Sequence, residues 1–130
     1  MKIPKFEAQT EWVKPTEFPD LRQVEEIAID LETKDPDLLK KGSGSVIGNG
    51  EVIGIAVATK HFKGYFPIAH EGGGNMDRAR VLSWLKDILE APSTKVFHNA
   101  IYDVCWLRAM GFKINGDIAC TMIAAALTDE

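Results

Sequence analysis

Hydrophobic and polar positions in the first half of the chain form three short runs with strand-like spacing. Residues 1–24 contain prolines and no sustained periodicity, which predicts an extended lead-in. Residues 25–33 (EEIAIDLET) alternate Ile and Leu with polar residues, the pattern of a half-buried strand. Residues 51–60 and 61–70 are rich in β-branched and aromatic residues and predict two more strands joined by a short connection. Between the first and second strands, residues 35–50 are dense in Gly, Asp and Ser and predict a loop.

The second half of the chain changes to helical spacing. After a glycine-rich connection, Asn75 predicts the N-cap of a helix with one buried stripe. That stripe comprises Ala79, Leu82, Leu85, Ile88 and Leu89. Residues 93–98 predict a short strand, and residues 99–110 predict a second helix that ends before Gly111. A third, largely apolar helix is predicted for residues 119–130.

This order of elements predicts the fold class. Consecutive strands with short connections pair antiparallel, whereas strands separated by a helix pair parallel. We therefore expect an α/β fold with a mixed sheet, in which three antiparallel strands precede β-α units and helices pack on the faces of the sheet. A length of 130 residues suits one domain, with residues 1–24 as the lead-in and residues 25–130 as its body.

Composition and charge narrow the class of protein. The chain is 45% hydrophobic and 26% charged, with a formal net charge of −4, which are ordinary values for a soluble globular protein. A protein that grips duplex DNA through a broad basic face is usually basic, so contact with nucleic acid must be local. No run approaches the roughly 20 apolar residues of a membrane span, and the N-terminus lacks the apolar core of a signal peptide. We expect no membrane contact and a cytoplasmic location.

Two acidic side chains interrupt the predicted strand at residues 25–33. Asp30 and Glu32 are two residues apart, so both carboxylates point to one side while Ile29 and Leu31 point to the other. Asp and Glu are poor strand formers, and two like charges at this spacing repel each other. A bound cation would offset that repulsion. The alternative is a solvated sheet face that carries two acidic residues.

A second polar group lies on the predicted helix at residues 99–110. Asn99, Tyr102 and Asp103 are at positions i, i+3 and i+4 and share a polar edge of the helix. Asn99 alone is explained by an N-cap, and Tyr102 alone by core packing. If Asp103 faces the end of the strand at residues 25–33, three carboxylates converge. Such hard oxygen ligands favour Mg²⁺ or Mn²⁺, and two such ions can promote hydrolysis of a phosphodiester.

These two groups resemble the motifs of a known enzyme family. Asp30-Leu31-Glu32-Thr33 resembles the DxET first motif of the DEDD 3′→5′ exonucleases, and HNAIYD at residues 98–103 is similar to their second motif. From about residue 12 to the last residue, the chain resembles the proofreading domain of family A DNA polymerases, especially phage-encoded ones. The resemblance implies a ribonuclease H-like fold and removal of nucleotides from the 3′ end of single-stranded DNA.

Carried over position by position, the resemblance implies the site residues and their partners. The catalytic residues and metal ligands would be Asp30, Glu32 and Asp103. The contacts to substrate would be Thr33, Asn99, Tyr102 and His98. The cofactor would be Mg²⁺ or Mn²⁺ at a two-metal site, and the partner a polymerase domain in cis or in trans. A phage-encoded protein of this kind would work in the host cytoplasm.

Two departures from the family pattern change what is expected of this chain. The family has a fourth Asp in a YxxxD or HxxxD motif on a later helix, and no such motif follows Asp103 here. We therefore expect residues 25–130 to be a partial exonuclease domain. Relatives commonly have Asp where Cys120 stands, which predicts a local change. The alternatives are a non-catalytic module that binds single-stranded nucleic acid or docks on a polymerase, and a fragment that needs further helices to fold.

Overall fold

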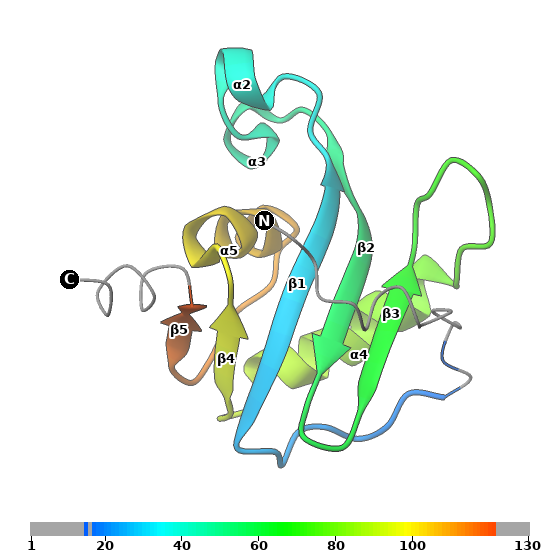
Figure 1. The fold of residues 1–130 in the computed structure, drawn as a ribbon, viewed down its shortest axis with the longest axis vertical. Coiled ribbons are helices and arrows are strands. Elements are labelled where there is room, and N and C mark those ends of the chain that lie inside the picture. Colours follow the sequence, from blue (N-terminus) through cyan, green and yellow to red (C-terminus); the bar gives the residue numbers. More distant parts are fainter. Residues whose placement is uncertain (1–14, 16, 122–130) are drawn as a thin grey trace.

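The computed structural model describes residue 15 and residues 17–121. Most of the predicted lead-in and most of the predicted helix at residues 119–130 lie outside the described residues. The elements run, in chain order (Figure 1), β1 (Glu26–Lys34), α2 (Leu38–Lys41), α3 (Gly44–Ile47), β2 (Glu51–Ala58), β3 (Lys63–Pro67), α4 (Arg78–Glu90), β4 (Thr94–Phe97), α5 (Ala100–Ala109) and β5 (Ile118–Cys120).

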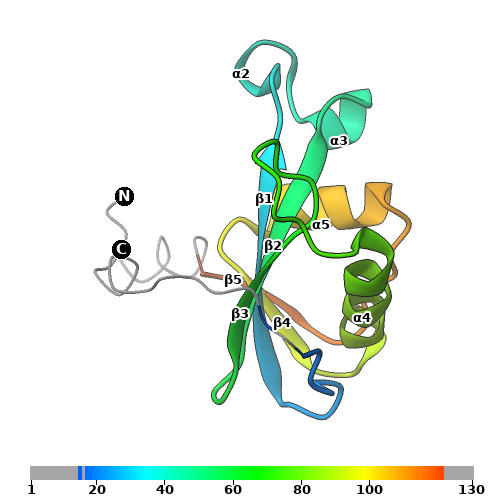
Figure 2. The ribbon, with the colours of Figure 1, turned by 90° about the vertical axis from the view of Figure 1, so that its right-hand side faces the viewer.

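The strands form one mixed sheet in the order β3-β2-β1-β4-β5. β1 pairs antiparallel with β2, and β2 with β3, whereas β4 runs parallel to β1 and to β5. The predicted mixed sheet is confirmed. The crossovers through α4 and α5 move in the same direction across the sheet. Because such crossovers are right-handed, both helices lie on the same face, as Figure 2 shows.

The hydrophobic core lies between this sheet face and the two helices. On β1, Ile27, Ile29 and Leu31 are buried, and they belong to the same core cluster as Leu85 and Ile88 of α4. The alternation of β1 is the period expected of a strand with one covered face. Burying these side chains provides the main favourable contribution to folding, at about 1.5–3 kcal/mol for each large apolar side chain.

The other face of β1 carries the two acidic residues. Ala28, Asp30 and Glu32 are all exposed and alternate with the buried residues of the same strand. The prediction that both carboxylates lie on one side of the strand, opposite Ile29 and Leu31, is therefore confirmed. No described helix covers this face in Figure 2.

The predicted loop at residues 35–50 contains two short helices, α2 and α3. The carboxylate of Asp35 accepts hydrogen bonds from the backbone N–H of Gly44 at 3.0 and 3.1 Å, at the start of α3. The Ser43 side chain accepts from the backbone N–H of Ser45 as the N-cap. Each helix has four residues, which is too short to produce a hydrophobic period in the sequence.

The start of α4 differs from the prediction. Its N-cap is Asp77, whose side chain accepts from a backbone N–H of the first turn, whereas Asn75 bonds the backbone of His70. The buried stripe also differs, because Ala79 is exposed and Leu82 is only partly buried. The buried residues of α4 are Val81, Trp84, Leu85, Ile88 and Leu89. The bulky indole of Trp84 occupies the buried side, so the stripe runs along a different line of the helix.

The C-terminal part of the described chain differs as well. The prediction placed a helix from residue 119, but residues 118–120 form β5, which pairs with β4 through Val96 and Ala119. Sheet pairing with an existing edge strand outweighs helix propensity here. The predicted end of α5 is confirmed, because Gly111 has a φ of 96° and donates its N–H to the carbonyl of Arg108.

Candidate active site

Asp103 reaches β1 where the neighbouring strand stops. β4 pairs with β1 only as far as Ala28 opposite Val96, and the chain then turns into α5, beside the rest of β1 (Figure 1). The backbone N–H of Leu31 donates a hydrogen bond to the Asp103 carboxylate. Asp103 is only 4% exposed, whereas Tyr102 is partly buried and Asn99, at the start of the same helix edge, is exposed.

The environment of Asp103 disfavours its charge. Burial and, after it, the nearby charge of Asp30 raise the pKa of the Asp103 carboxyl from 3.8 to about 7, against a smaller lowering by the Leu31 N–H. Its Oδ2 atom is buried and has no hydrogen-bond partner among the described residues. Such groups are rare in folded proteins, and a role in binding an ion is one of the standard explanations.

Asp30 lies beside this buried group, on the open face of β1. Loss of water around its carboxyl raises its pKa, the charge of Glu32 raises it further, and His98 acts in the opposite direction. The Asp30 carboxylate is therefore within electrostatic reach of Glu32, His98 and Asp103. Two carboxylates close together, one with a buried oxygen lacking a partner, are the hard donors that Mg²⁺ and Mn²⁺ prefer. The Asp30–Asp103 pair fits a divalent cation on this ground.

The Glu32 carboxylate has partners of its own. The hydroxyl of Tyr65 donates a hydrogen bond to Oε1 of Glu32, and Nε2 of His70 lies 3.3 Å from the same oxygen. Across the described residues, no three His, Cys, Asp or Glu side chains form a group that could hold a metal ion. The structure thus brings Asp30 and Asp103 together, while Glu32 is engaged by β3 and the residues after it.

Tyr102 connects α5 to the end of β1. Its hydroxyl donates to Oδ2 of Asp35 at 2.8 Å and lies 2.8 Å from Oγ1 of Thr33. Because the single tyrosine proton goes to Asp35, the Thr33 hydroxyl donates to the tyrosine oxygen. Asp35 also caps Gly44, so one carboxylate holds both α5 and α3 at the end of β1. Sequence analysis did not single out Asp35, and its only signal is its place directly after the strand.

Asn99 and His98 lie at the turn from β4 into α5, and both are exposed. The Asn99 side chain caps α5 and accepts from the backbone N–H of Tyr102 at 3.5 Å, as the N-cap interpretation predicted. Nδ1 of His98 lies 3.1 Å from Oγ1 of Thr121. His98 is also close enough to Asp30 to act on its carboxyl, and the contact of both residues with substrate stays a prediction.

Cys120, the last residue of β5, contacts the same turn. Its sulfur accepts a hydrogen bond from the backbone N–H of Ala100 at 3.4 Å and donates one to the carbonyl of His98 at 3.2 Å. The thiol therefore bonds to the backbone at the start of α5. This arrangement fits the expectation of a local change at this position, because neither bond involves one of the three acidic residues.

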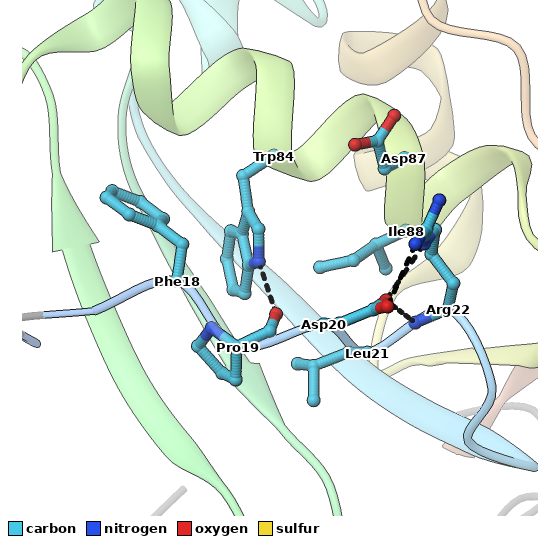
Figure 3. A pocket seen from close by; sticks show the side chains of 8 residues that line it. All are labelled: Phe18, Pro19, Asp20, Leu21, Arg22, Trp84, Asp87 and Ile88. Carbon is cyan, nitrogen blue, oxygen red and sulfur yellow. Dashed lines mark hydrogen bonds and ion pairs between the residues drawn. The ribbon is translucent and has the colours of Figure 1, made fainter.

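A separate hollow of about 230 Å³ lies between α4 and the segment before β1, and Figure 3 shows it from close by. Its walls are Phe18, Pro19, Asp20, Leu21, Arg22, Trp84, Asp87 and Ile88. Nε1 of Trp84 donates to the carbonyl of Pro19 at 2.7 Å and fastens the segment to the helix. None of the predicted site residues lines this hollow, so it belongs to the packing of the segment on α4.

Among the described helices, none is long and apolar enough to cross a membrane.

Comparisons with known proteins show the family to which the chain belongs. A family model described as 3′-5′ exonuclease matches residues 16–130. The chain is 41% identical over 114 residues to a DNA-directed DNA polymerase of Pseudomonas phage M6, covering 80% of this chain and 16% of that protein. It is 29% identical over 115 residues to the DNA polymerase DpoZ of Acinetobacter phage SH-Ab 15497, covering 87% and 16%. The chain thus spans about a sixth of the length of these relatives.

Solved structures with the same fold include two of NrnC from Brucella melitensis. The one with bound Mg²⁺ has a TM-score of 0.57 and 19% identity, covering 89% of this chain and 50% of that one. The other has a TM-score of 0.55 and 23% identity, covering 85% and 47%. This likeness shows the predicted ribonuclease H-like fold. The family match over residues 16–130 shows that the chain belongs to the family of 3′-5′ exonuclease domains.

Proposed function

We propose that this chain hydrolyses the terminal phosphodiester at the 3′ end of single-stranded DNA and releases nucleoside monophosphates. The observation that supports this most directly is the pairing of Asp30 with the buried Asp103, whose Oδ2 has no partner among the described residues. This pair lies in a member of the 3′-5′ exonuclease family. A pair of carboxylates is costly to place together, and a divalent cation would offset that cost.

Asp30 and Asp103 would hold Mg²⁺ or Mn²⁺, and Glu32, on the same face of β1, would supply the third carboxylate. When bound, a pair of such ions activates water and stabilises the charge on the leaving oxygen. Asp103 would bind in its ionised form. Because its pKa is about 7, the chain would take up a cation more readily above that pH.

Other residues of the chain would orient the DNA end. Thr33 is held at the end of β1 by Tyr102, which would place the terminal nucleotide against the Asp30 side of the strand. His98 and Asn99 are exposed at the turn into α5, where they would contact the sugar-phosphate backbone of the substrate strand. A 3′ end in a duplex could not reach carboxylates that lie against the sheet, so the substrate would be single-stranded or frayed.

The polymerase relatives suggest the setting of this activity. The chain aligns with a sixth of two phage DNA polymerases, so a polymerase domain, in cis or in trans, would supply the 3′ ends. Removal of a mismatched nucleotide before further synthesis would then be proofreading. In an infected cell, this work would take place in the host cytoplasm.

The test is release of mononucleotides from a 3′-labelled single-stranded oligonucleotide in the presence of Mg²⁺ or Mn²⁺. We expect Asp30→Ala and Asp103→Asn each to lower the rate by more than about 100-fold, beyond the usual effect of residues that only support a ligand. Asp87→Asn on α4 is the matched control, because Asp87 is exposed and lies on the hollow away from the site. Release that survives both site substitutions would contradict the proposal.

A second function is favoured by one observation. Because the described residues contain no group of three metal-binding side chains, the fold could serve as a non-catalytic module that binds single-stranded nucleic acid or docks on a polymerase. This function predicts that the chain binds the oligonucleotide, or the polymerase, with no release at any Mg²⁺ or Mn²⁺ concentration. Release that depends on Asp103 would exclude it.

A further inference from the structure

Tyr65 reaches Glu32 from two strands away. The paired positions across the open face are Glu32, Gly54 and Pro67 in one row, and Asp30, Ala56 and Tyr65 in the next. Neighbouring strands are about 4.8 Å apart, so a side chain on β3 must cross the whole width of β2 to touch β1. The Tyr65 ring makes that crossing diagonally, and its hydroxyl donates to Oε1 of Glu32.

Gly54 provides the space for this crossing. A Cβ atom at Gly54 would lie 1.7 Å from the Tyr65 hydroxyl oxygen and 2.3 Å from the ring carbon that carries it. Gly54 lies in β2 next to the register shift with β1, but it has no positive φ, so its backbone conformation does not require glycine. The absence of a side chain here serves the contact between Tyr65 and Glu32.

His70 completes the contact from the other side. Its Nε2 lies 2.6 Å from the Tyr65 hydroxyl and 3.3 Å from Oε1 of Glu32. Because Tyr65 gives its proton to Glu32, Nε2 must carry the proton of the bond between His70 and Tyr65. The Tyr65 O–H and the His70 Nε2–H therefore both point toward the region around Oε1 of Glu32. This leaves the second oxygen, Oε2, for another partner.

Hydrogen bonds within the loop after β3 hold His70 in place. The backbone N–H of His70 donates to Oδ1 of Asn75 at 2.7 Å, and Nδ2 of Asn75 donates to the His70 carbonyl at 3.0 Å. An ion pair between Glu71 and Lys34 ties the same loop to the end of β1. Asn75, which sequence analysis expected as a helix cap, has this role instead. His70, which contacts Glu32, is therefore itself held in place by the contacts of this loop.

We propose that Tyr65 and His70 are positioning residues, which fix the Glu32 carboxylate through Oε1 so that Oε2 acts together with Asp30. This inference rests on the proposed nuclease function, because it gives Glu32 a part in binding the cation or the terminal 3′ hydroxyl. A glutamate has three rotatable side-chain bonds, and a carboxylate next to Asp30 would otherwise turn away from the like charge. Holding one oxygen removes that freedom before substrate arrives.

The first arm of the test measures the contact itself, without metal and without substrate. The unfolding free energies of the full 130-residue chain, of Tyr65→Phe, of Glu32→Ala and of the double variant form a double-mutant cycle in urea. We expect a coupling clearly different from zero between the two positions. A coupling of zero within error would overturn the inference, whether or not the chain proves to be a nuclease.

The second arm measures the consequence of the contact. Mn²⁺ titration, followed by the paramagnetic resonance of the unbound ion, compares the parent chain with Tyr65→Phe and Gly54→Ala. We expect Mn²⁺ affinity and kcat on the 3′-labelled oligonucleotide each to fall about 10-fold, with KM unchanged, as is usual when support for a ligand is lost. Gly72→Ala is the matched control, because a Cβ at Gly72 meets no atom within 4 Å.

Conservative variants separate positioning from general damage. His70→Gln keeps an N–H donor and is expected to retain most of the Mn²⁺ affinity, whereas His70→Leu is expected to lose as much as Tyr65→Phe. Equal or tighter Mn²⁺ binding by Tyr65→Phe would overturn the inference. If the parent chain shows coupling and Mn²⁺ binding that Tyr65→Phe weakens but no nucleotide release, the positioning role stands and the proposed nuclease function fails.

Discussion

Asp103 on α5 lies beside Asp30 on β1, near enough for the charge of Asp30 to raise the pKa of the buried Asp103 carboxyl. The contact exists because β4 ends after four residues and leaves the remaining edge of β1 to α5. Leu31 then donates its backbone N–H to Asp103. The position of this acidic pair is therefore set by the length of a neighbouring strand.

Stability of the metal-free chain should fall as pH rises from about 4 to about 7. The pKa of Asp103 is about 7 in the folded chain against 3.8 for an ordinary aspartate carboxyl, so the folded chain binds the proton more tightly. The contribution of the protonated Asp103 carboxyl to stability is fully present below the lower pKa and is lost as pH rises through the higher pKa. Burial of the charge should cost on the order of a few kcal/mol above pH 7.

Urea unfolding at several pH values measures this effect. We expect Asp103→Asn to unfold with a much weaker pH dependence between pH 4 and 7 than the parent chain, because the amide does not titrate. Asp87→Asn, which changes an exposed residue of α4, should keep the dependence of the parent. An identical slope in the parent chain and in Asp103→Asn would show that the buried carboxyl is not its source.

Divalent cations should stabilise the chain through the same pair of carboxylates. A ligand that binds only the folded chain stabilises it by about 2.7 kcal/mol at 100 times its Kd. Thermal unfolding at pH 8 should therefore shift upward with Mn²⁺ concentration in the parent and not in Asp30→Ala or Asp103→Asn. A shift of the same size in both variants would locate the bound ion elsewhere.

Tyr102→Phe should loosen the short helices without unfolding the domain. The change removes the hydrogen bonds to Thr33 and Asp35, at a cost of about 0.5–1.5 kcal/mol for each lost bond, because both partners are only partly buried. Because Asp35 also caps α3, hydrogen exchange at residues 44–47 should speed up more than exchange in the β1–β2 pairing. Uniform acceleration across the sheet would mean that Tyr102 supports the whole fold instead.

Lys95→Met should destabilise the chain strongly although it replaces a charged residue by an apolar one. Lys95 is fully buried, and its ammonium donates to the backbone carbonyls of Ala91, Ser93 and Asn115. Removing the ammonium leaves these carbonyls without a hydrogen-bond donor, and each buried unsatisfied group lowers the free energy of unfolding by about 1–3 kcal/mol. Urea unfolding should show a loss within that range or above it. Lys113→Met, at an exposed position, should stay within about 0.5 kcal/mol of the parent.

Much of the fold follows from the sequence because its strands and long helices carry clear periods. The alternation in β1 predicted both its buried face and the shared side of Asp30 and Glu32. The HNAIYD segment predicted a helix, and it predicted a shared site only on the condition that Asp103 faces β1. The electrostatic link between Asp103 and Asp30 agrees with that condition. These features depend on local spacing, which one sequence records directly.

Other features depend on contacts between distant residues, which local spacing does not record. The row that joins Glu32 to Gly54 is set by strand register, and β1 and β2 shift register between Glu32 and Thr33. Tyr65 therefore looked like an ordinary strand residue. In the same way, the choice of Asp77 over Asn75 as the cap of α4 reflects the bond between Asn75 and the His70 backbone.

The hydroxyl of Tyr102 has a consequence for how this family can vary in evolution. Thr33 and Asp35 meet that hydroxyl from the same end of β1 that presents Asp30 to Asp103. A single inserted or deleted codon between Asp30 and Asp35 would exchange inward and outward side chains, and it would separate the anchor from the acidic pair. Length changes should instead accumulate in stretches such as residues 72–74, where an added side chain meets no neighbour.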